Sequence, residues 1–198
     1  MKQILCFGDS NTWGLDGETG KRFPWEKLAD RDIRIVEEGL CGRTTIFEDP
    51  LRLGRRGTEL LPTLLETHTP DAVVLMLGTN DCKTIFGASA EIIGKGIARL
   101  LEQINQYTDK MKVLVISPIY LGEKVWQDGY DQEFSPESVE VSKKLEPVYE
   151  KVAGKYGKRF MRAADYAGPS EADQEHMDGQ SHKILADAIY RKLEAEIL

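Results

Sequence analysis

Short apolar segments rich in β-branched residues alternate along this chain with longer stretches of helical periodicity. This alternation is typical of strand–helix units, because each helix returns the chain to the edge at which the next parallel strand begins. The segment AVVLMLG, which starts at Ala72, is apolar on both faces and predicts a buried central strand. The predicted strands cover residues 4–7, 33–36, 72–77, 113–116 and 159–161.

The predicted helices lie between these strands and after the last one. In the C-terminal helix, Ile184, Leu185, Ala188, Ile189 and Leu193 recur at three- and four-residue spacing and form an apolar face. The chain has 198 residues without repeats or linker-like tracts, so we predict a single domain over residues 1–198. Its fold class is a three-layer α/β/α sandwich around a mostly parallel five-stranded sheet. The predicted helices cover residues 25–29, 57–66, 88–107, 136–156 and 181–197.

Charge and composition narrow the class of partner. Lys plus Arg total 26 and Asp plus Glu total 33, so the net charge is −7, and we expect no nucleic-acid partner. The apolar segment before Gly8 is too short for a signal peptide, and no apolar run approaches the roughly 20 residues of a membrane span. The three cysteines are widely spaced, which predicts reduced thiols, no zinc site and a cytoplasmic protein.

The unusual sequence motifs all follow predicted strands. Because ligands of open α/β sheets bind at the carboxyl ends of the strands, we expect the functional site at that edge. Two long connections, residues 39–54 and 118–135, belong to the same edge, and long loops in compact domains are often functional. In strand order, the motifs are FGDSNTWG, GLCGRTT, LGTND, SPIYL and ADQEHMDGQSH.

Ser10 lies two residues after Gly8, at the turn that follows the first strand. A serine there would be exposed at the edge of the sheet, and the first amides of a following helix would lie beside any oxyanion formed at it. The same GDS segment also suits a turn that only caps the next helix. The local sequence leaves both interpretations open.

The motifs FGDSNTWG, GLCGRTT and MLGTND, followed by an Asp-x-x-His pair before a C-terminal helix, resemble those of the SGNH (GDSL) hydrolases. Within that family the chain is similar to the small arylesterase and acyltransferase branch, from Lys2 to about Leu193. The resemblance implies a flavodoxin-like fold and a serine esterase that needs no cofactor or metal. It also implies Ser10 as the nucleophile, with the amides of Ser10, Gly42 and the Asn80 side chain as oxyanion donors.

The catalytic base is expected to be one of three histidines. His68 precedes a buried strand, at the wrong end of the sheet, and is expected to be structural. Asp173 and His176 have the spacing of the family's Asp-x-x-His pair, whereas Asp178 and His182 are one residue further apart. Asp178 suits the N-cap of the last helix, which would place His182 in the first helical turn. We therefore assign the pair to Asp173 and His176, with His182 as the alternative.

The Asp-x-x-His spacing lets one short loop supply both groups. The carboxylate binds the imidazole Nδ1–H and stabilises the imidazolium, while Nε2 faces the serine. Gln174 stands where the family often has a glycine. This chain therefore departs from the family's motif at a residue that affects the conformation of the loop.

Residues beside these motifs are candidates for supporting the site and for contacting the substrate. Arg43 is a candidate for pairing with Asp9 or Asp81, with a solvated arginine as the alternative. The candidate supporting residues are Asp9, Thr12, Arg43 and Asp81. The candidate walls of an acyl or alcohol pocket, each of which also suits a core or rim position, are Trp13, Ile85, Phe86, Tyr120 and Trp126.

The resemblance implies a small ester as substrate. Because the chain has little length for a lid, we expect an open site and short acyl groups such as acetyl. A carbohydrate O-acetylesterase is the alternative within the enzyme class, and a catalytically silent binding module on the same fold is the alternative outside it. Acyl transfer to alcohols and a homo-oligomer are further features of similar proteins.

Overall fold

The computed structural model describes residues 1–25 and 33–198. Its five strands form one sheet in the order β2-β1-β3-β4-β5, and every pairing between them is parallel. The predicted fold class is therefore confirmed. The strands are β1 (Lys2–Gly8), β2 (Ile33–Gly39), β3 (Ala72–Met76), β4 (Lys112–Ser117) and β5 (Arg159–Arg162).

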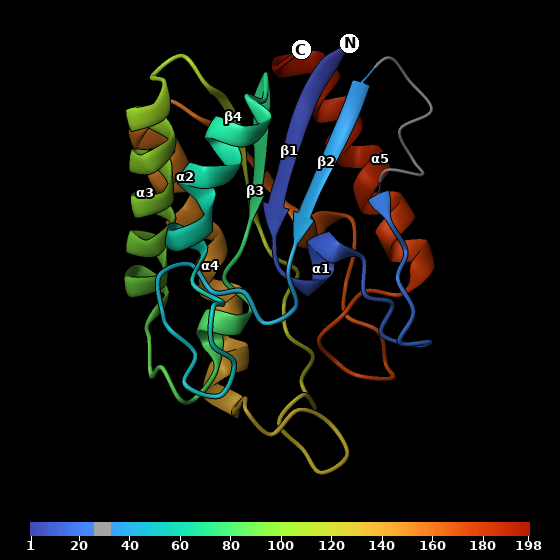
Figure 1. Cartoon of the computed structure of the whole chain (residues 1–198). Helices are drawn as coiled ribbons and strands as arrows, with labels where there is room; N and C mark the ends of the chain where they lie inside the picture. The colour runs from blue at the N-terminus through green and yellow to red at the C-terminus, as the bar shows by residue number, and fades with distance from the viewer. Residues whose placement is uncertain (26–32) are drawn as a thin grey trace.

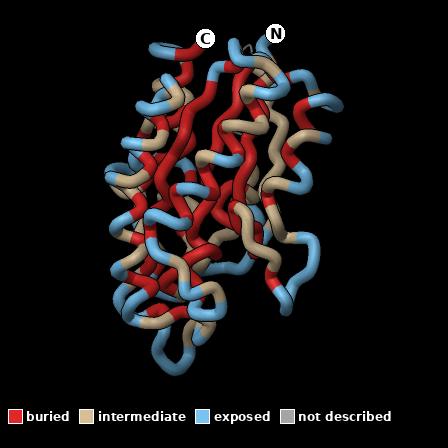
Figure 2. The backbone as a smooth tube through the Cα atoms, turned by 90° about the vertical axis from the view of Figure 1, so that its left-hand side faces the viewer, coloured by how far each residue is buried: buried red, intermediate tan, exposed pale blue. Residues whose placement is uncertain are grey.

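Helices cover both faces of the sheet, which makes three layers (Figure 1). One face carries α2 (Gly57–His68), α3 (Ala90–Tyr107) and α4 (Pro136–Lys155), and the other face carries α5 (Gly179–Glu196). Because successive strand residues point to opposite faces, β1 sends Leu5 and Phe7 into the first core and Ile4 and Cys6 into the second. β1, β3 and β4 are buried over most of their length, and Figure 2 shows long buried stretches through the middle of the molecule.

The ends of the helices differ from the predictions by a few residues, and capping side chains explain the differences. Ser89 accepts a hydrogen bond from the amide of Ile92, so α3 begins two residues later than predicted. Asp178 accepts one from the amide of Ser181 at 2.6 Å, so α5 begins two residues earlier than predicted. The predicted helix over residues 25–29 lies almost entirely outside the described residues.

A tight turn joins β1 to the four-residue helix α1 (Ser10–Trp13). A Cβ atom at Gly8 would lie 1.9 Å from Thr12 Oγ1 and 2.6 Å from the carbonyl oxygen of Met76. Only glycine fits between this turn and β3, because a backbone oxygen cannot give way as a flexible side chain can. The close approach places the start of α1 directly at the carboxyl edge of the sheet.

We therefore expect Gly8→Ala to lower the free energy of unfolding by about 3 kcal/mol or more, measured by urea denaturation. The matched control is Gly154→Ala in α4, where an added Cβ meets nothing within 4 Å. That substitution should raise the stability by about 0.5 kcal/mol, because alanine restricts the unfolded chain and favours the helix. Equal stability of the two variants would contradict the steric argument.

Candidate active site

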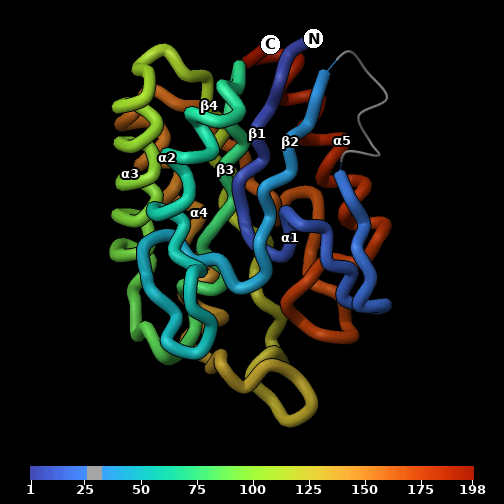
Figure 3. Tube along the Cα trace, viewed as in Figure 1, coloured from blue at the N-terminus to red at the C-terminus, as the bar shows by residue number. Residues whose placement is uncertain are grey.

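The segments that follow the strands gather at one end of the molecule, away from both termini (Figure 3). Ser10, Gly42, Asn80 and His176 come from four of these segments and line a common pocket. The expected convergence of the motifs at this edge is therefore present in the structure. The residues lining the pocket are Ser10, Leu15, Cys41, Gly42, Arg52, Arg55, Asn80, Lys83, Asp131, Glu175 and His176.

Ser10, His176 and Asp173 form a continuous line of hydrogen bonds. Ser10 Oγ lies 2.8 Å from His176 Nε2, and His176 Nδ1 lies 2.7 Å from Asp173 Oδ2. The second carboxylate oxygen of Asp173 accepts from the amides of His176 at 2.8 Å and Glu175 at 3.0 Å. The carboxylate thus favours the tautomer with a proton on Nδ1, in which Nε2 is free to accept the serine proton.

The electrostatics of this line favour an ionised aspartate beside a basic imidazole. Burial alone would raise the pKa of Asp173, but hydrogen bonds from His176 and Glu175 bring it below its usual value. Burial would likewise lower the pKa of His176, but the hydrogen bond to Asp173 and the charges of Glu175, Asp173 and Asp9 raise it above its usual value. Such an imidazole accepts a proton more readily than one in water.

The unusual glutamine of the Asp-x-x-His loop adopts a left-handed backbone conformation. Gln174 has φ of 64°, which favours glycine and agrees with the frequent glycine at this place in the family. The glutamine is held by the long loop after β4: its carbonyl accepts from the amide of Gly122 at 2.8 Å, and its Oε1 accepts from that of Lys124 at 3.3 Å. These contacts offset the backbone strain and fasten the two loops together.

The three candidate oxyanion donors come from three segments. Ser10 is the first residue of α1, and an amide in the first helical turn has no acceptor within the helix. Gly42 has φ of 82°, which a glycine adopts readily. Asn80 begins the 3₁₀ helix η2 (Asn80–Cys82), and its Nδ2 donates to the carbonyl of Arg43 at 3.2 Å. An amide nitrogen carries two hydrogens, so this bond leaves one for a ligand.

Two buried carboxyl groups support the loops around the pocket. Asp9 caps α1 by accepting from the amide of Asn11 at 3.0 Å, and burial raises its pKa to about 6. Asp81 accepts from the amide of Thr45 at 3.0 Å and from the Thr45 hydroxyl, and burial raises its pKa to about 7. Thr12 is buried against Gly8. Asp81 thus joins the loop after β3 to the loop after β2.

Arg43 differs from both sequence-based expectations. It is buried, and its Nη1 donates to the carbonyl oxygens of Gly8, at 2.9 Å, and Glu38. Its guanidinium also lies 4.2 Å from the centre of the Phe7 ring. Neither an ion pair with Asp9 or Asp81 nor a solvated side chain describes this residue. Its hydrogen-bond partners are backbone carbonyls at the ends of β1 and β2, and the sequence does not reveal such partners.

The residues expected as walls of an acyl or alcohol pocket have other surroundings in the structure. The five residues Trp13, Ile85, Phe86, Tyr120 and Trp126 are absent from the lining of the pocket at Ser10, as far as the structure is described. Phe86 stacks on Phe47 with 5.0 Å between ring centres, and Tyr120 donates to the carboxylate of Glu146 in α4. The other three side chains are half-buried or exposed. Aromatic character alone does not show in which direction a loop side chain points.

Charged residues line the pocket instead. Of these, Glu175 lies next to His176 in the sequence, and its Oε1 is 3.8 Å from His176 Nε2. Arg52 lies in the long 39–54 connection and Arg55 directly follows it, both in the segment RLGRR. This cluster of arginines in a long connection was the sequence signal that could have identified them. The sequence-based argument missed these residues because it sought apolar walls. The charged lining residues are Arg52, Arg55, Lys83, Asp131 and Glu175.

Asn11, which the sequence-based argument did not single out, links the two halves of the serine–histidine pair. Its Oδ1 accepts from the amide of Met177 at 3.2 Å, and its Nδ2 donates to the carbonyl of Glu175 at 3.4 Å. Asn11 follows Ser10, and its two partners flank His176. The side chain therefore holds the histidine loop against the start of α1.

The other two histidines lie outside the pocket lining. His182 is fully buried in the first turn of α5, with Nε2 2.9 Å from the carbonyl oxygen of Leu15 and Nδ1 3.3 Å from Trp25 Nε1. Trp25 donates to Nδ1, so the proton on Nε2 is the one donated to Leu15. His68 ends α2, with its ring 3.7 Å from the carboxylate of Glu38.

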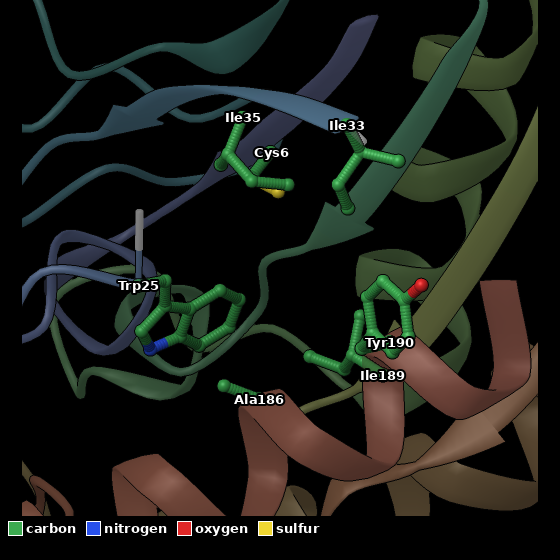
Figure 4. Close-up of a pocket in the computed structure, with 7 residues that line it drawn as sticks. All are labelled: Cys6, Trp25, Ile33, Ile35, Ala186, Ile189 and Tyr190. Carbon is green, nitrogen blue, oxygen red and sulfur yellow. The ribbon is translucent and has the colours of Figure 1, made fainter. Parts of the chain in front are cut away.

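A second pocket lies between β2 and α5 (Figure 4). Its lining is almost wholly apolar. It shares no residue with the pocket at Ser10. The lining residues are Cys6, Trp25, Ile33, Ile35, Ala186, Ile189 and Tyr190.

None of the helices in the described ranges combines the length and the apolar character needed to cross a membrane.

Comparison with known proteins identifies a family and several similar structures. Residues 6–183 match the model of the GDSL-like lipase/acylhydrolase family. A solved carbohydrate acetylesterase family member from Sinorhizobium meliloti is 32% identical, with a TM-score of 0.89 over 98% of each chain. The native aryl esterase of M. smegmatis is 30% identical, with a TM-score of 0.86 over 98% of this chain and 99% of that one.

Among curated proteins, an arylesterase from Vibrio mimicus is 28% identical over 109 residues. The match covers 52% of this chain and 48% of that protein, so it spans about half the length of the curated relative.

Proposed function

Because this chain belongs to the GDSL-like lipase/acylhydrolase family, we propose that it is a serine esterase in which Ser10 is the nucleophile. His176 is the general base, and Asp173 orients its ring. The observation that carries the proposal is the unbroken line of contacts of 2.7 Å and 2.8 Å from Asp173 through His176 to Ser10, of which His176 and Ser10 line a pocket.

In the first half of the reaction, Ser10 Oγ attacks the ester carbonyl carbon and its proton passes to His176 Nε2. The amides of Ser10 and Gly42 and the side chain of Asn80 donate to the resulting oxyanion. The tetrahedral intermediate then collapses, the bond to the leaving oxygen breaks, and His176 returns the proton to the departing alcohol. Ser10 is left as an acyl ester.

In the second half, water attacks the acyl-enzyme and gives its proton to His176. The same donors hold the second oxyanion, and collapse releases the carboxylic acid and restores the Ser10 hydroxyl with the proton from His176. Asp173 stays ionised throughout and stabilises the imidazolium. Transfer of the acyl group to an alcohol in place of water stays a prediction.

The preferred substrates are esters with short acyl groups. The pocket lining is mostly charged and polar, and Leu15 is its largest apolar side chain. A long acyl chain therefore gains little by leaving water. We expect kcat/KM for p-nitrophenyl octanoate to be below that for p-nitrophenyl acetate; a clear preference for the octanoate would contradict this reading of the pocket.

A carbohydrate O-acetylesterase is the second candidate function. Two solved structures from Sinorhizobium meliloti, both described as carbohydrate acetylesterases, are 32% identical to this chain and cover 98% of it. Faster turnover of acetylated xylose than of phenyl acetate would favour this candidate. The reverse order would favour an arylesterase.

Labelling with a p-nitrophenyl phosphonate tests the proposed nucleophile directly. We expect one covalent adduct per chain, located on the peptide that contains Ser10 and absent from Ser10→Ala. The phosphonate mimics the tetrahedral intermediate, so its reaction requires both an activated serine and oxyanion donors. A folded protein that does not react would instead indicate a catalytically silent binding module.

Glu175→Gln is expected to shift the acid limb of the pH profile of kcat/KM to lower pH. This limb follows the pKa of His176 in the free enzyme, because protonated imidazole cannot accept the serine proton. Burial raises the pKa of Glu175 to about 7, so part of this group is ionised where the limb falls, and its charge, 3.8 Å from Nε2, contributes to raising the pKa of His176. Removing that charge lowers the pKa of His176. The variant should thus retain activity at a pH where the wild type has lost it.

The matched control for this measurement is Glu171→Gln. Glu171 belongs to the same loop, but its side chain is 89% exposed and its charge is screened by solvent. The acid limb of the Glu171→Gln profile should coincide with that of the wild type. If the limb of Glu175→Gln stays in place as well, Glu175 does not influence the base.

A further inference from the structure

Two arginine side chains border Gly42, one of the proposed oxyanion donors. A Cβ atom added to Gly42 would lie 3.4 Å from Arg52 Cδ, 3.6 Å from Arg55 Nε and 3.7 Å from Arg52 Nη1. Both arginines also line the pocket at Ser10. The positive charges therefore stand a few ångströms from the place where the ester carbonyl would bind.

Arg55 is held in position without a carboxylate partner. Its Nε donates to the carbonyl of Cys41 at 2.9 Å and its Nη1 to that of Leu53 at 3.2 Å. Its own carbonyl accepts from the amide of Thr44 at 3.1 Å, which ties this backbone to the loop after β2. Within residues 1–25 and 33–198, no acidic side chain forms an ion pair with Arg55. A guanidinium has five N–H donors, so three remain for a ligand.

The other charges of the pocket leave Arg55 as the available cation. Arg52 lies 3.3 Å from Glu133, and Lys83 pairs with the same carboxylate. Asp131 accepts from the backbone amide of Glu133 at 2.9 Å, within its own loop. Arg52 and Lys83 thus share one carboxylate, whereas the charge of Arg55 is compensated by carbonyl dipoles alone. In a chain with net charge −7, Arg55 is thus a local positive charge at the pocket.

Glu175 also lines the pocket, but it faces the histidine rather than the arginines. Its carboxylate is 3.8 Å from His176 Nε2, and burial raises its pKa to about 7. Near neutral pH a considerable fraction of Glu175 is therefore uncharged, which weakens its repulsion of an anionic ligand.

We propose that this enzyme prefers esters that carry a carboxylate a few atoms from the scissile carbonyl, and that Arg55, assisted by Arg52, binds this carboxylate. The inference rests on the proposed function, because it takes the position of the substrate carbonyl from the Gly42 amide. The planar guanidinium matches a carboxylate with two parallel hydrogen bonds, which a lysine cannot provide. The carboxylate belongs to either the acyl or the alcohol part of the ester.

Two pairs of substrates distinguish these sources. Methyl hydrogen succinate against dimethyl succinate places the charge on the acyl side, and acetoxyacetate against 2-acetoxyacetamide places it on the alcohol side. In at least one pair, the wild type should show kcat/KM about tenfold or more higher for the anionic ester, as a charge-assisted hydrogen bond predicts. This preference should decrease as NaCl is added.

Arg55→Gln should reduce the ratio of anionic to neutral kcat/KM by about tenfold, and Arg52→Gln should reduce it less, because Arg52 already has a partner. The matched control is Arg99→Gln, in which an exposed arginine of α3 loses its pair with Glu102 at 3.0 Å. Its ratio should equal that of the wild type. The wild-type comparison needs no variant, so it tests the inference even if Arg55→Gln does not fold.

The inference is overturned if the wild type shows no anionic preference in either pair, or if Arg55→Gln keeps the full preference. Its failure differs from failure of the proposed function. If only the inference fails, the phosphonate still labels Ser10 and neutral esters are still hydrolysed. If the proposed function fails, the folded wild type shows neither labelling nor hydrolysis of any ester.

Discussion

Ser10→Ala is expected to lower kcat for p-nitrophenyl acetate by about 10⁴-fold or more. The serine oxygen is the atom that bonds to the acyl group, and His176 Nε2, 2.8 Å away, has no other hydroxyl to activate at that position in the described structure. The variant can only direct water at the ester with the oxyanion donors still in place. Such residual catalysis is small beside that of an intact serine–histidine pair.

Steady-state kinetics and urea denaturation together test this expectation. Ser10 is almost fully buried and its hydroxyl contacts His176, so we expect the stability of Ser10→Ala to change by about 1 kcal/mol or less. The matched control is Ser117→Ala at the carboxyl end of β4, whose hydroxyl is buried without a partner among the described residues. The control should retain wild-type kcat. A folded Ser10→Ala enzyme with a tenth of the wild-type activity would exclude Ser10 as the nucleophile.

His176→Ala is expected to lose activity to a similar extent, about 10⁴-fold or more, because the serine loses the group that accepts its proton. Its Nδ1 contact with Asp173 at 2.7 Å and its Nε2 contact with Ser10 at 2.8 Å both disappear. The measurement is kcat for p-nitrophenyl acetate, with and without added imidazole. A small base that enters the space left by the side chain should restore part of the activity.

His182→Ala is the matched control, since it removes a second imidazole from the same segment. Its ring is fully buried, with nitrogen contacts to Leu15 and Trp25 at 2.9 Å and 3.3 Å. We expect a loss of about 3 kcal/mol in the free energy of unfolding from the cavity and the lost hydrogen bonds, and a loss of activity far below a hundredfold. If the folded His182→Ala enzyme is the inactive one, the base has been assigned to the wrong histidine.

Features that depend on the order of neighbouring residues can be predicted without the structure. The five strands and the main helices follow from periodicity, because a side chain's spacing along the chain decides which face it occupies. The cap of α5 also follows from local residues, since Asp178 reaches an amide only three positions away. Motifs placed after strands had to meet at one edge, because all the strands are parallel.

The set of side chains around Ser10 depends on contacts between distant segments and could not be predicted from the sequence. Arg55, Lys83 and Glu175 come from three loops, and no spacing along the chain relates them. Phe86, Tyr120 and Trp126, which were expected at this pocket, are not among its described lining residues, because a loop has no fixed period that would orient its side chains. Asn11 links α1 to the histidine loop through a hydrogen bond to Glu175, a residue 164 positions away in the sequence. Local sequence sets the direction of side chains within helices and strands, whereas in loops that direction depends on contacts between distant segments.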